Sequence, residues 1–152
     1  MVEEGDRVPK FVINDADGNK VKSTDFKGKK HVIYFYPKDF TPGCSTQADE
    51  FSQNYEKFQD NGIEIIGISP DDTSLHKKFC IKMGIKYTLL SDTEKEVSKA
   101  FGVWGMKKFM GREYMGVTRS SFLVNNAGKI FKIYSKVKPK GHAKQVLEDF
   151  TK

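Results

Sequence analysis

Two continuous apolar stretches, separated by a helical pattern, constrain the fold of this 152-residue chain more than any other feature. The stretches His31–Tyr36 and Ile63–Ser69 are rich in β-branched and aromatic residues, which is typical of buried strands. Between them, apolar residues recur at spacings of three, four and three and mark one face of a helix running to about Asp60. That face consists of Ala48, Phe51, Tyr55 and Phe58. The order strand, helix, strand favours an α/β domain around a central sheet.

Turn residues indicate two hairpins. Near the N-terminus, Phe11–Ile13 and Lys20–Val21 flank a stretch of Asp, Gly and Asn, which predicts an N-terminal β-hairpin. Toward the C-terminus, Ser121–Val124 and Lys129–Tyr134 flank Asn125–Gly128, and we expect these two strands to pair antiparallel.

Three further helical patterns complete the expected topology. The first is marked by Leu75, Phe79 and Met83, the second covers roughly 94–101, and the last follows Pro139 and Gly141. The last helix directs Ala143, Val146, Leu147 and Phe150 inward. The whole pattern predicts a central mixed β-sheet flanked by helices on both faces, the layout of a thioredoxin-like fold. With no internal repeat or linker, residues 1–152 should form a single domain.

Composition excludes several classes of protein. Hydrophobic residues make up 38% and charged residues 30% of the chain, so we expect a soluble globular protein. The apolar runs are far shorter than the roughly 20 residues that span a bilayer. The acidic N-terminal residues do not resemble a signal peptide, and we expect a cytoplasmic protein without a membrane partner. Two cysteines and three histidines without metal-ligand spacing argue against a disulfide-stapled scaffold and against a metal site.

The net charge of +6 comes from one C-terminal segment. Residues 126–147 hold no acid and six lysines, which are Lys129, Lys132, Lys136, Lys138, Lys140 and Lys144. Phe131 and Tyr134 beside them allow a nucleic-acid interpretation, because aromatic stacking next to basic residues is a common way of binding single strands. We favour solvated lysines on a strand and a helix, with no nucleic-acid partner. The segment lies far along the chain from Cys44, so we expect it to say little about the chemistry.

The most informative segment leads from the first buried strand into the first long helix. Thr41 is a favoured N-cap residue, and Pro42 suits the first helical position because its missing N–H would have no intrahelical partner there. Cys44 then falls in the first turn, where free amides and the helix dipole favour a thiolate. It also lies on the inward stripe with Ala48. The residues alone leave open whether Cys44 is a nucleophile or a small buried thiol that packs as a hydrophobe.

A histidine base for Cys44, as in a Cys–His hydrolase, is the weaker interpretation. The three histidines carry no recognisable partner signal. His31 opens a buried strand, His76 is expected at an exposed helical position among lysines, and His142 starts the last helix.

Positive potential would favour the thiolate without any base. Arg119 lies just before the strand Ser121–Val124, and an arginine entering a buried strand is costly unless it pairs with an anion. We therefore regard Arg119 as the source of that potential at Cys44. The alternative is a salt bridge with an acid such as Asp39 or Glu50.

The pattern Pro37-x-x-x-Thr41-x-x-Cys44 resembles the active-site pattern of peroxiredoxins, the thiol peroxidases. The wider run Phe35–Cys44 is similar to the peroxiredoxin Q, or bacterioferritin comigratory protein, subgroup. Further matches in order and spacing cover nearly the whole chain; they are Leu89–Asp92, Gly102–Gly105, Tyr114–Gly116 and Arg119–Leu123.

The resemblance implies a separate role for each residue of the pattern. Cys44 would be the peroxidatic cysteine, attacking the O–O bond of hydrogen peroxide or an alkyl hydroperoxide and becoming a sulfenic acid. Thr41 would hydrogen-bond the peroxide, Arg119 would hold the thiolate and the polarised peroxide, and Pro37 would shield the pocket from water. No cofactor is expected, because sulfur carries the electrons. The reductant would be thioredoxin or a similar dithiol protein, and the subgroup is often monomeric.

The chain departs from the subgroup at the resolving cysteine. Many members carry it five residues after the peroxidatic one, where this chain has Asp49. Other members place it on the following helix, where Cys80 lies 36 residues after Cys44 at the margin of the apolar stripe. A disulfide needs α-carbons within roughly 7 Å, so we expect Thr41–Thr46 and part of Asp72–Met83 to unwind after oxidation.

Two alternatives remain at this point. The enzyme could be a 1-Cys-type peroxidase that uses an external thiol, with Cys80 structural. The chain could instead be a non-enzymatic redox sensor on a thioredoxin fold. Met106 replaces the acid more usual beside Trp104-Gly105, with a role that the sequence does not define.

Overall fold

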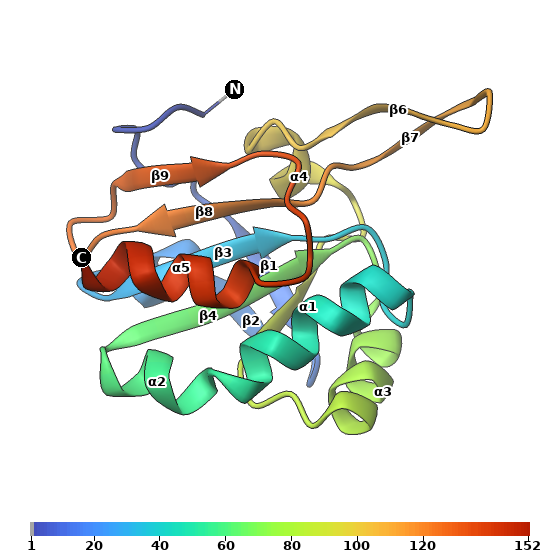
Figure 1. Cartoon of the computed structure of the whole chain (residues 1–152). Helices are drawn as coiled ribbons and strands as arrows, with labels where there is room; N and C mark the ends of the chain where they lie inside the picture. Colours follow the sequence, from blue (N-terminus) through green and yellow to red (C-terminus); the bar gives the residue numbers. More distant parts are fainter. Residues whose placement is uncertain (1) are drawn as a thin grey trace.

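The computed structural model describes residues 2–152 and builds them around a mixed sheet of seven strands (Figure 1). The strands are β1 (Val12–Asp15), β2 (Lys20–Lys22), β3 (Lys30–Phe35), β4 (Ile63–Ser69), β5 (Thr88–Ser91), β8 (Ser120–Val124) and β9 (Ile130–Tyr134). Their order is β2-β1-β5-β4-β3-β8-β9. Strands β3, β4 and β5 run parallel, and β1 and β8 join this parallel core antiparallel. The predicted mixed sheet, the N-terminal strand pair and the β8–β9 hairpin are all confirmed.

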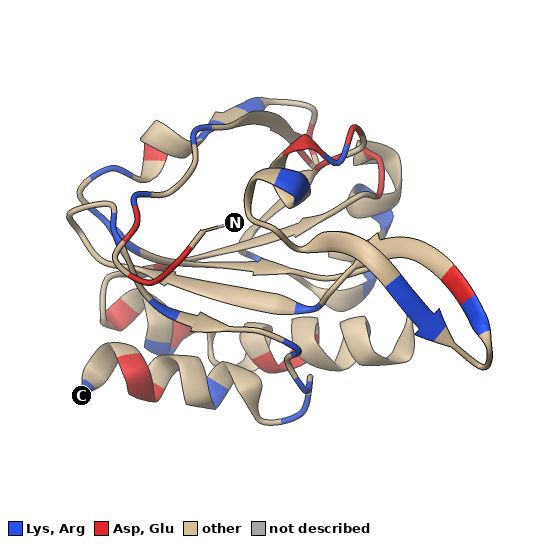
Figure 2. Ribbon diagram, turned by 90° about the horizontal axis from the view of Figure 1, so that it is seen from above, with Lys and Arg blue, Asp and Glu red and all other residues tan. Residues whose placement is uncertain are grey.

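Helices cover both faces of the sheet. They are α1 (Pro42–Gln53), α2 (Tyr55–Asp60), α3 (Thr73–Met83), α4 (Glu96–Ala100) and α5 (His142–Thr151), with a 3₁₀ turn η1 (Ser23–Phe26). Strand β3 explains the two layers, because Val32 and Tyr34 pack with residues of α1, α2, α3 and α5, whereas Ile33 and Phe35 pack with η1 and α4. The turned view in Figure 2 shows α1 and α5 on one side of the sheet and α4 on the other. Strand β3 is therefore apolar on both faces, as its sequence predicts.

The helix predicted to run from the Cys44 segment to about Asp60 is wrong in one respect. It is divided at Asn54, which ends α1 and starts α2 with φ −99° and ψ 5°. The Asn54 side-chain amide donates to the carbonyl of Glu50 at 2.8 Å, competing with the backbone for this acceptor. The apolar spacing continues across the break, so periodicity alone could not reveal it.

Three strands were not predicted. Strand β5 is short and lies inside the sheet between β1 and β4. Strands β6 (Trp104–Phe109) and β7 (Arg112–Val117) form a separate hairpin that extends away from the body of the molecule (Figure 1). The large apolar side chains exposed on it are Met106, Phe109, Met110, Tyr114 and Met115. Within residues 2–152, no helix is long and apolar enough to cross a lipid bilayer.

Candidate active site

Cys44 lies where the sequence places it, in the first turn of α1 directly after the β3–α1 loop. Thr41 is the N-cap residue with an extended backbone (φ −78°, ψ 151°), and Pro42 begins the helix. The Cys44 side chain is only 2% exposed and packs in the same core as Ala48 and Phe51. The first amides of a helix have no intrahelical acceptor, so the sulfur lies at the positive end of α1.

The Thr41 hydroxyl differs from the predicted cap. Its Oγ1 donates to the carbonyl of Lys38 at 2.8 Å instead of accepting from an amide of α1. This bond therefore joins two residues of the β3–α1 loop, Thr41 and Lys38. Pro37 begins the same loop and is half-buried, so the loop carries both residues within a few positions of Cys44.

Arg119 is the group that contacts the sulfur. Its Nη2 donates to Cys44 Sγ at 3.2 Å, and its Nη1 donates to Gln47 Oε1 at 2.7 Å. Both terminal nitrogens of the planar guanidinium are therefore hydrogen-bonded, which fixes the orientation of the group. A Cβ at Gly43 would lie 3.1 Å from Nη2, so glycine leaves room for the guanidinium beside the start of α1.

The alternative that Arg119 pairs with a nearby acid is wrong for both acids considered. Asp39 is occupied by His76, whose Nδ1 lies 2.6 Å from Asp39 Oδ2. Glu50 accepts from the backbone N–H of Gly141 at 2.7 Å. Sulfur and an amide oxygen, rather than a carboxylate, are the partners of Arg119.

Gln47 was not predicted as a residue of the site. It lies three residues after Cys44 on the same face of α1 and is 1% exposed. Its Oε1 accepts from Arg119, while its Nε2 has no hydrogen-bond partner in the part of the chain that the structure describes. A polar residue at i+3 from a candidate nucleophile was the available signal, since such residues share one helix face.

The prediction for His76 is wrong. The residue is fully buried, and its Nε2 lies 2.9 Å from the carbonyl oxygen of Leu90, while its Nδ1 faces Asp39. His142 is also buried, and its Nε2 lies 2.7 Å from Ser121 Oγ. Burial lowers the pKa of His142 below its ordinary value, although the bond to Gln145 opposes this. The ring nitrogens of these histidines thus bond to groups other than Cys44.

Asp39, Asp71 and His76 form a group of side chains close enough to be considered for a metal ion. Their ligand atoms lie within 4.8 Å of one another. Both nitrogens of His76 and both oxygens of Asp39 already have hydrogen-bond partners in the protein. The group therefore forms a hydrogen-bond network and presents few free lone pairs to a cation.

Cys80 lies in α3 and is partly buried, and both thiols are free. It packs against the core that contains Cys44 and also lines a cavity of about 410 Å³ together with Asp17, Lys77 and Ile81. Burial is the largest cause that raises the pKa of the Cys80 thiol to about 11, and the negative charge of Asp39 is the next largest. Cys80 is thus protonated at neutral pH in this conformation.

The lysine-rich segment lies beside the site, contrary to the expectation drawn from its distance along the chain. The Val137 N–H donates to the carbonyl of Arg119 at 2.8 Å, and the Gly141 N–H donates to Glu50 on α1. A cavity of about 510 Å³, formed by this loop and α5, is lined by four of the lysines, Lys136, Lys138, Lys140 and Lys144.

Comparison with known proteins gives one consistent result. The model of the AhpC/TSA family matches residues 4–133. The chain is 43% identical to Peroxiredoxin Bcp of Bacillus subtilis strain 168 over 147 residues, covering 97% of this chain and 94% of the relative. It is 41% identical to Peroxiredoxin Bcp of Escherichia coli strain K12 over 146 residues, covering 96% and 94%.

Solved structures show the same similarity. Peroxiredoxin Q of Xanthomonas campestris superimposes with a TM-score of 0.88 at 35% identity, covering 93% of this chain and 89% of that one. A cysteine-to-serine mutant of Xylella fastidiosa PrxQ superimposes with a TM-score of 0.94 at 30% identity, covering 99% and 96%.

Proposed function

This chain belongs to the AhpC/TSA family as a thiol peroxidase of the peroxiredoxin Q and Bcp group, and from that premise we propose which residues carry the reaction. Cys44 is the peroxidatic cysteine. The observation that carries this proposal is the 3.2 Å contact between Arg119 Nη2 and the buried Cys44 sulfur. His76 and His142 bond to other groups, and the Nδ1 of His31 lies 2.9 Å from the carbonyl oxygen of Lys29. Charge and hydrogen bonding, rather than a histidine base, therefore hold the thiolate.

In the first step, the Cys44 thiolate attacks one oxygen of a hydroperoxide. An S–O bond forms, the O–O bond breaks, and the released oxide takes up a proton to leave as an alcohol or as water. Sulfur is oxidised to a sulfenic acid and the peroxide is reduced. Arg119 stabilises the negative charge as it moves from sulfur along the O–O bond. Pro37 limits access of water to the sulfur from the β3–α1 loop.

Thr41 supplies the remaining hydrogen bond to the peroxide. Its hydroxyl, now donating to Lys38, turns toward the substrate when a peroxide oxygen enters beside Cys44. We expect Thr41→Val, which is close in shape but lacks the hydroxyl, to lower kcat/KM for hydrogen peroxide by about 10²-fold. Thr41→Ser, the matched control, should stay within about tenfold of the native enzyme. Stopped-flow oxidation kinetics check this, and equal rates for the valine and serine variants would contradict it.

Cys80 resolves the sulfenic acid. Its sulfur attacks Cys44, forming the disulfide and releasing the sulfenic oxygen as water. Two Xanthomonas campestris peroxiredoxin Q structures each carry serine at one cysteine, and these two cysteines have the same separation as Cys44 and Cys80. The first turn of α1 and part of α3 unwind to bring the thiols together. Thioredoxin or a similar dithiol protein then reduces the disulfide.

Replacement of Cys80 by serine tests this assignment. Without a resolving thiol, the sulfenic acid should form at the native rate but turn over slowly with a dithiol protein. We expect steady-state peroxidase activity with thioredoxin to fall at least about tenfold, while the first turnover is unchanged. Full turnover in Cys80→Ser would instead support a 1-Cys-type peroxidase with a structural Cys80.

We also propose that residues 1–152 act as a single domain and a monomer, without a nucleic-acid partner. The free thiols favour a reducing compartment such as the cytoplasm. Family membership makes the chain an enzyme, so the non-enzymatic redox-sensor alternative is wrong.

A further inference from the structure

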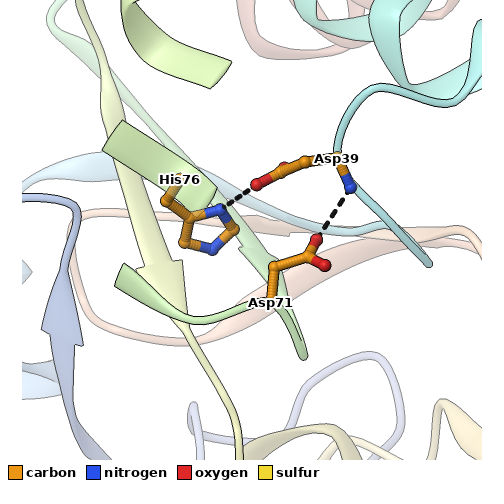
Figure 3. Close-up of side chains that lie close together, drawn as sticks. All are labelled: Asp39, Asp71 and His76. Carbon is orange, nitrogen blue, oxygen red and sulfur yellow. Dashed lines mark hydrogen bonds and ion pairs between the residues drawn. The ribbon is translucent and has the colours of Figure 1, made fainter. Parts of the chain in front are cut away.

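A buried ion pair joins the two segments that carry the thiols (Figure 3). His76 Nδ1 on α3 lies 2.6 Å from Asp39 Oδ2 in the β3–α1 loop, and both side chains are fully buried. Asp39 lies five residues before Cys44, and His76 lies four residues before Cys80 on α3. The pair thus connects the start of one thiol-bearing segment to the helix turn preceding the other thiol.

The geometry assigns the charge of His76. Its Nδ1 faces a carboxylate oxygen, and its Nε2 faces the carbonyl oxygen of Leu90 at 2.9 Å. Both neighbours are acceptors, so the ring satisfies them only as an imidazolium with two N–H donors. Burial opposes this charge, but the hydrogen bond to Asp39 and its negative charge raise the pKa of His76 above its ordinary value.

The groups that face His76 come from several elements. The β3–α1 loop contributes Asp39, whose Oδ1 also accepts from the Tyr36 hydroxyl at 2.6 Å. The β4–α3 loop contributes Asp71, whose Oδ2 accepts from the Asp39 N–H at 2.7 Å and from the Ser69 hydroxyl (Figure 3). Strand β5 contributes the neutral Leu90 carbonyl. These neighbours add negative charge and acceptors, so none of them replaces His76 as the cation.

The loop that this pair holds is conformationally strained. Phe40, directly after Asp39, has φ 66°, a left-handed conformation that is rare for a residue other than glycine. Its ring contacts Phe79 on α3, with ring centroids 5.1 Å apart. Such a conformation persists only when its surroundings hold it, and here the holding contacts come from α3. Loss of the ion pair would therefore favour release of the loop from α3.

We propose that His76 is a positioning residue for disulfide formation, because its ion pair with Asp39 holds α3 against the β3–α1 loop and limits how often the two segments open. This inference rests on the proposed resolving role of Cys80. His76 touches neither the peroxide nor the reacting sulfurs, and it acts through the position of the two segments.

The proposal predicts a defined pH dependence of opening. When the segments open, His76 enters water and its pKa returns to about 6.5. Because the pKa is raised in the closed form, the stabilisation is complete below about pH 6.5 and is lost as the pH rises through the raised value. In that window each opening event releases a proton. The opening constant should therefore rise with pH, approaching tenfold per pH unit.

Amide hydrogen exchange on the reduced protein measures this opening without any peroxide. The background is Cys80→Ser, which removes the titration of that thiol. After correction for intrinsic exchange, the opening constant of the β3–α1 loop and the first turns of α3 should rise with pH above about 6.5. His76→Gln should exchange about a hundredfold faster at pH 6 and show no such slope. A pH-independent opening constant with His76 present, or the same slope in His76→Gln, would overturn the proposal.

A neutral pair provides the matched control. In Asp39→Asn/His76→Gln the two amides can hydrogen-bond each other without a charge, so protection should recover toward that of the parent but stay independent of pH. If the role of His76 were merely structural, the parent and the Asp39→Asn/His76→Gln variant would show the same pH profile. Circular dichroism and cooperative thermal unfolding confirm that each variant is folded.

The rate of disulfide formation in proteins that retain Cys80 distinguishes failure of the positioning role of His76 from failure of the resolving role of Cys80. After one equivalent of peroxide, His76→Gln should form the Cys44–Cys80 disulfide faster than the native enzyme at pH 6, by about tenfold or more. Equal rates would overturn the role of His76 alone. Absence of the disulfide from both proteins would overturn the resolving role of Cys80.

Discussion

Replacing Cys44 with serine is expected to reduce peroxide turnover by roughly four to six orders of magnitude. A serine hydroxyl remains protonated in this site, and oxygen is a far weaker nucleophile than a thiolate toward the O–O bond. The loss should extend to the first turnover, because no sulfenic acid can form. Peroxide consumption with thioredoxin as reductant, together with a single-turnover measurement, checks the prediction.

The stability of this variant should change little. Cys44 is 2% exposed and serine is close to it in volume, so the main cost is a buried hydroxyl, for which Arg119 Nη2 is already a donor. Cys80→Ser is the matched control, since it also removes one thiol yet should keep the native first turnover. Measurable sulfenic acid formation in Cys44→Ser would contradict the assignment of Cys44.

Arg119→Lys is expected to lower kcat/KM for hydrogen peroxide by about 10²- to 10³-fold. The guanidinium reaches Cys44 Sγ and Gln47 Oε1 with two nitrogens, and a single ammonium cannot make both bonds in the same geometry. The charge is kept, so the loss measures orientation and the missing donor. Steady-state and stopped-flow peroxide kinetics give kcat/KM directly.

The control for this variant is Arg112→Lys on β7, an exposed arginine outside the site. It should keep native kcat/KM. Arg119→Met, which is similar in length but uncharged, should lose at least as much activity as Arg119→Lys. Native kcat/KM in Arg119→Lys would show that any cation near Cys44 suffices and would contradict the donor role.

The long buried elements of the fold were predictable because their signal is local. Strands β3 and β4 are continuous apolar runs, and α5 shows its apolar face at helical spacing. Strand β5 has only four residues, which is too short for its sequence to distinguish a strand from other structure. The β6–β7 hairpin exposes most of its large apolar residues, although Val117 is buried, and neither strand shows the alternation typical of a half-buried strand.

The arrangement of the candidate site was predictable where its residues are close in sequence or belong to a motif. Thr41 and Cys44 lie on one short segment. Arg119 precedes a buried strand, and an arginine in such a position is expected to pair with an anionic group. The partners of Asp39 and His76 were not predictable, because 37 residues separate the two and only the packing of α3 on the loop brings them together. The approach of the lysine-rich loop to Arg119 likewise depends on tertiary structure.

Our proposal is that Cys44 reduces the peroxide and that Cys80 resolves the resulting sulfenic acid. Intact and peptide mass spectrometry of the reduced protein, treated with one equivalent of hydrogen peroxide without added thiol, tests it most directly. We expect loss of two hydrogen atoms per chain and one crosslinked peptide pair containing Cys44 and Cys80. Persistent gain of one oxygen at Cys44, with Cys80 still free to alkylation, would contradict it.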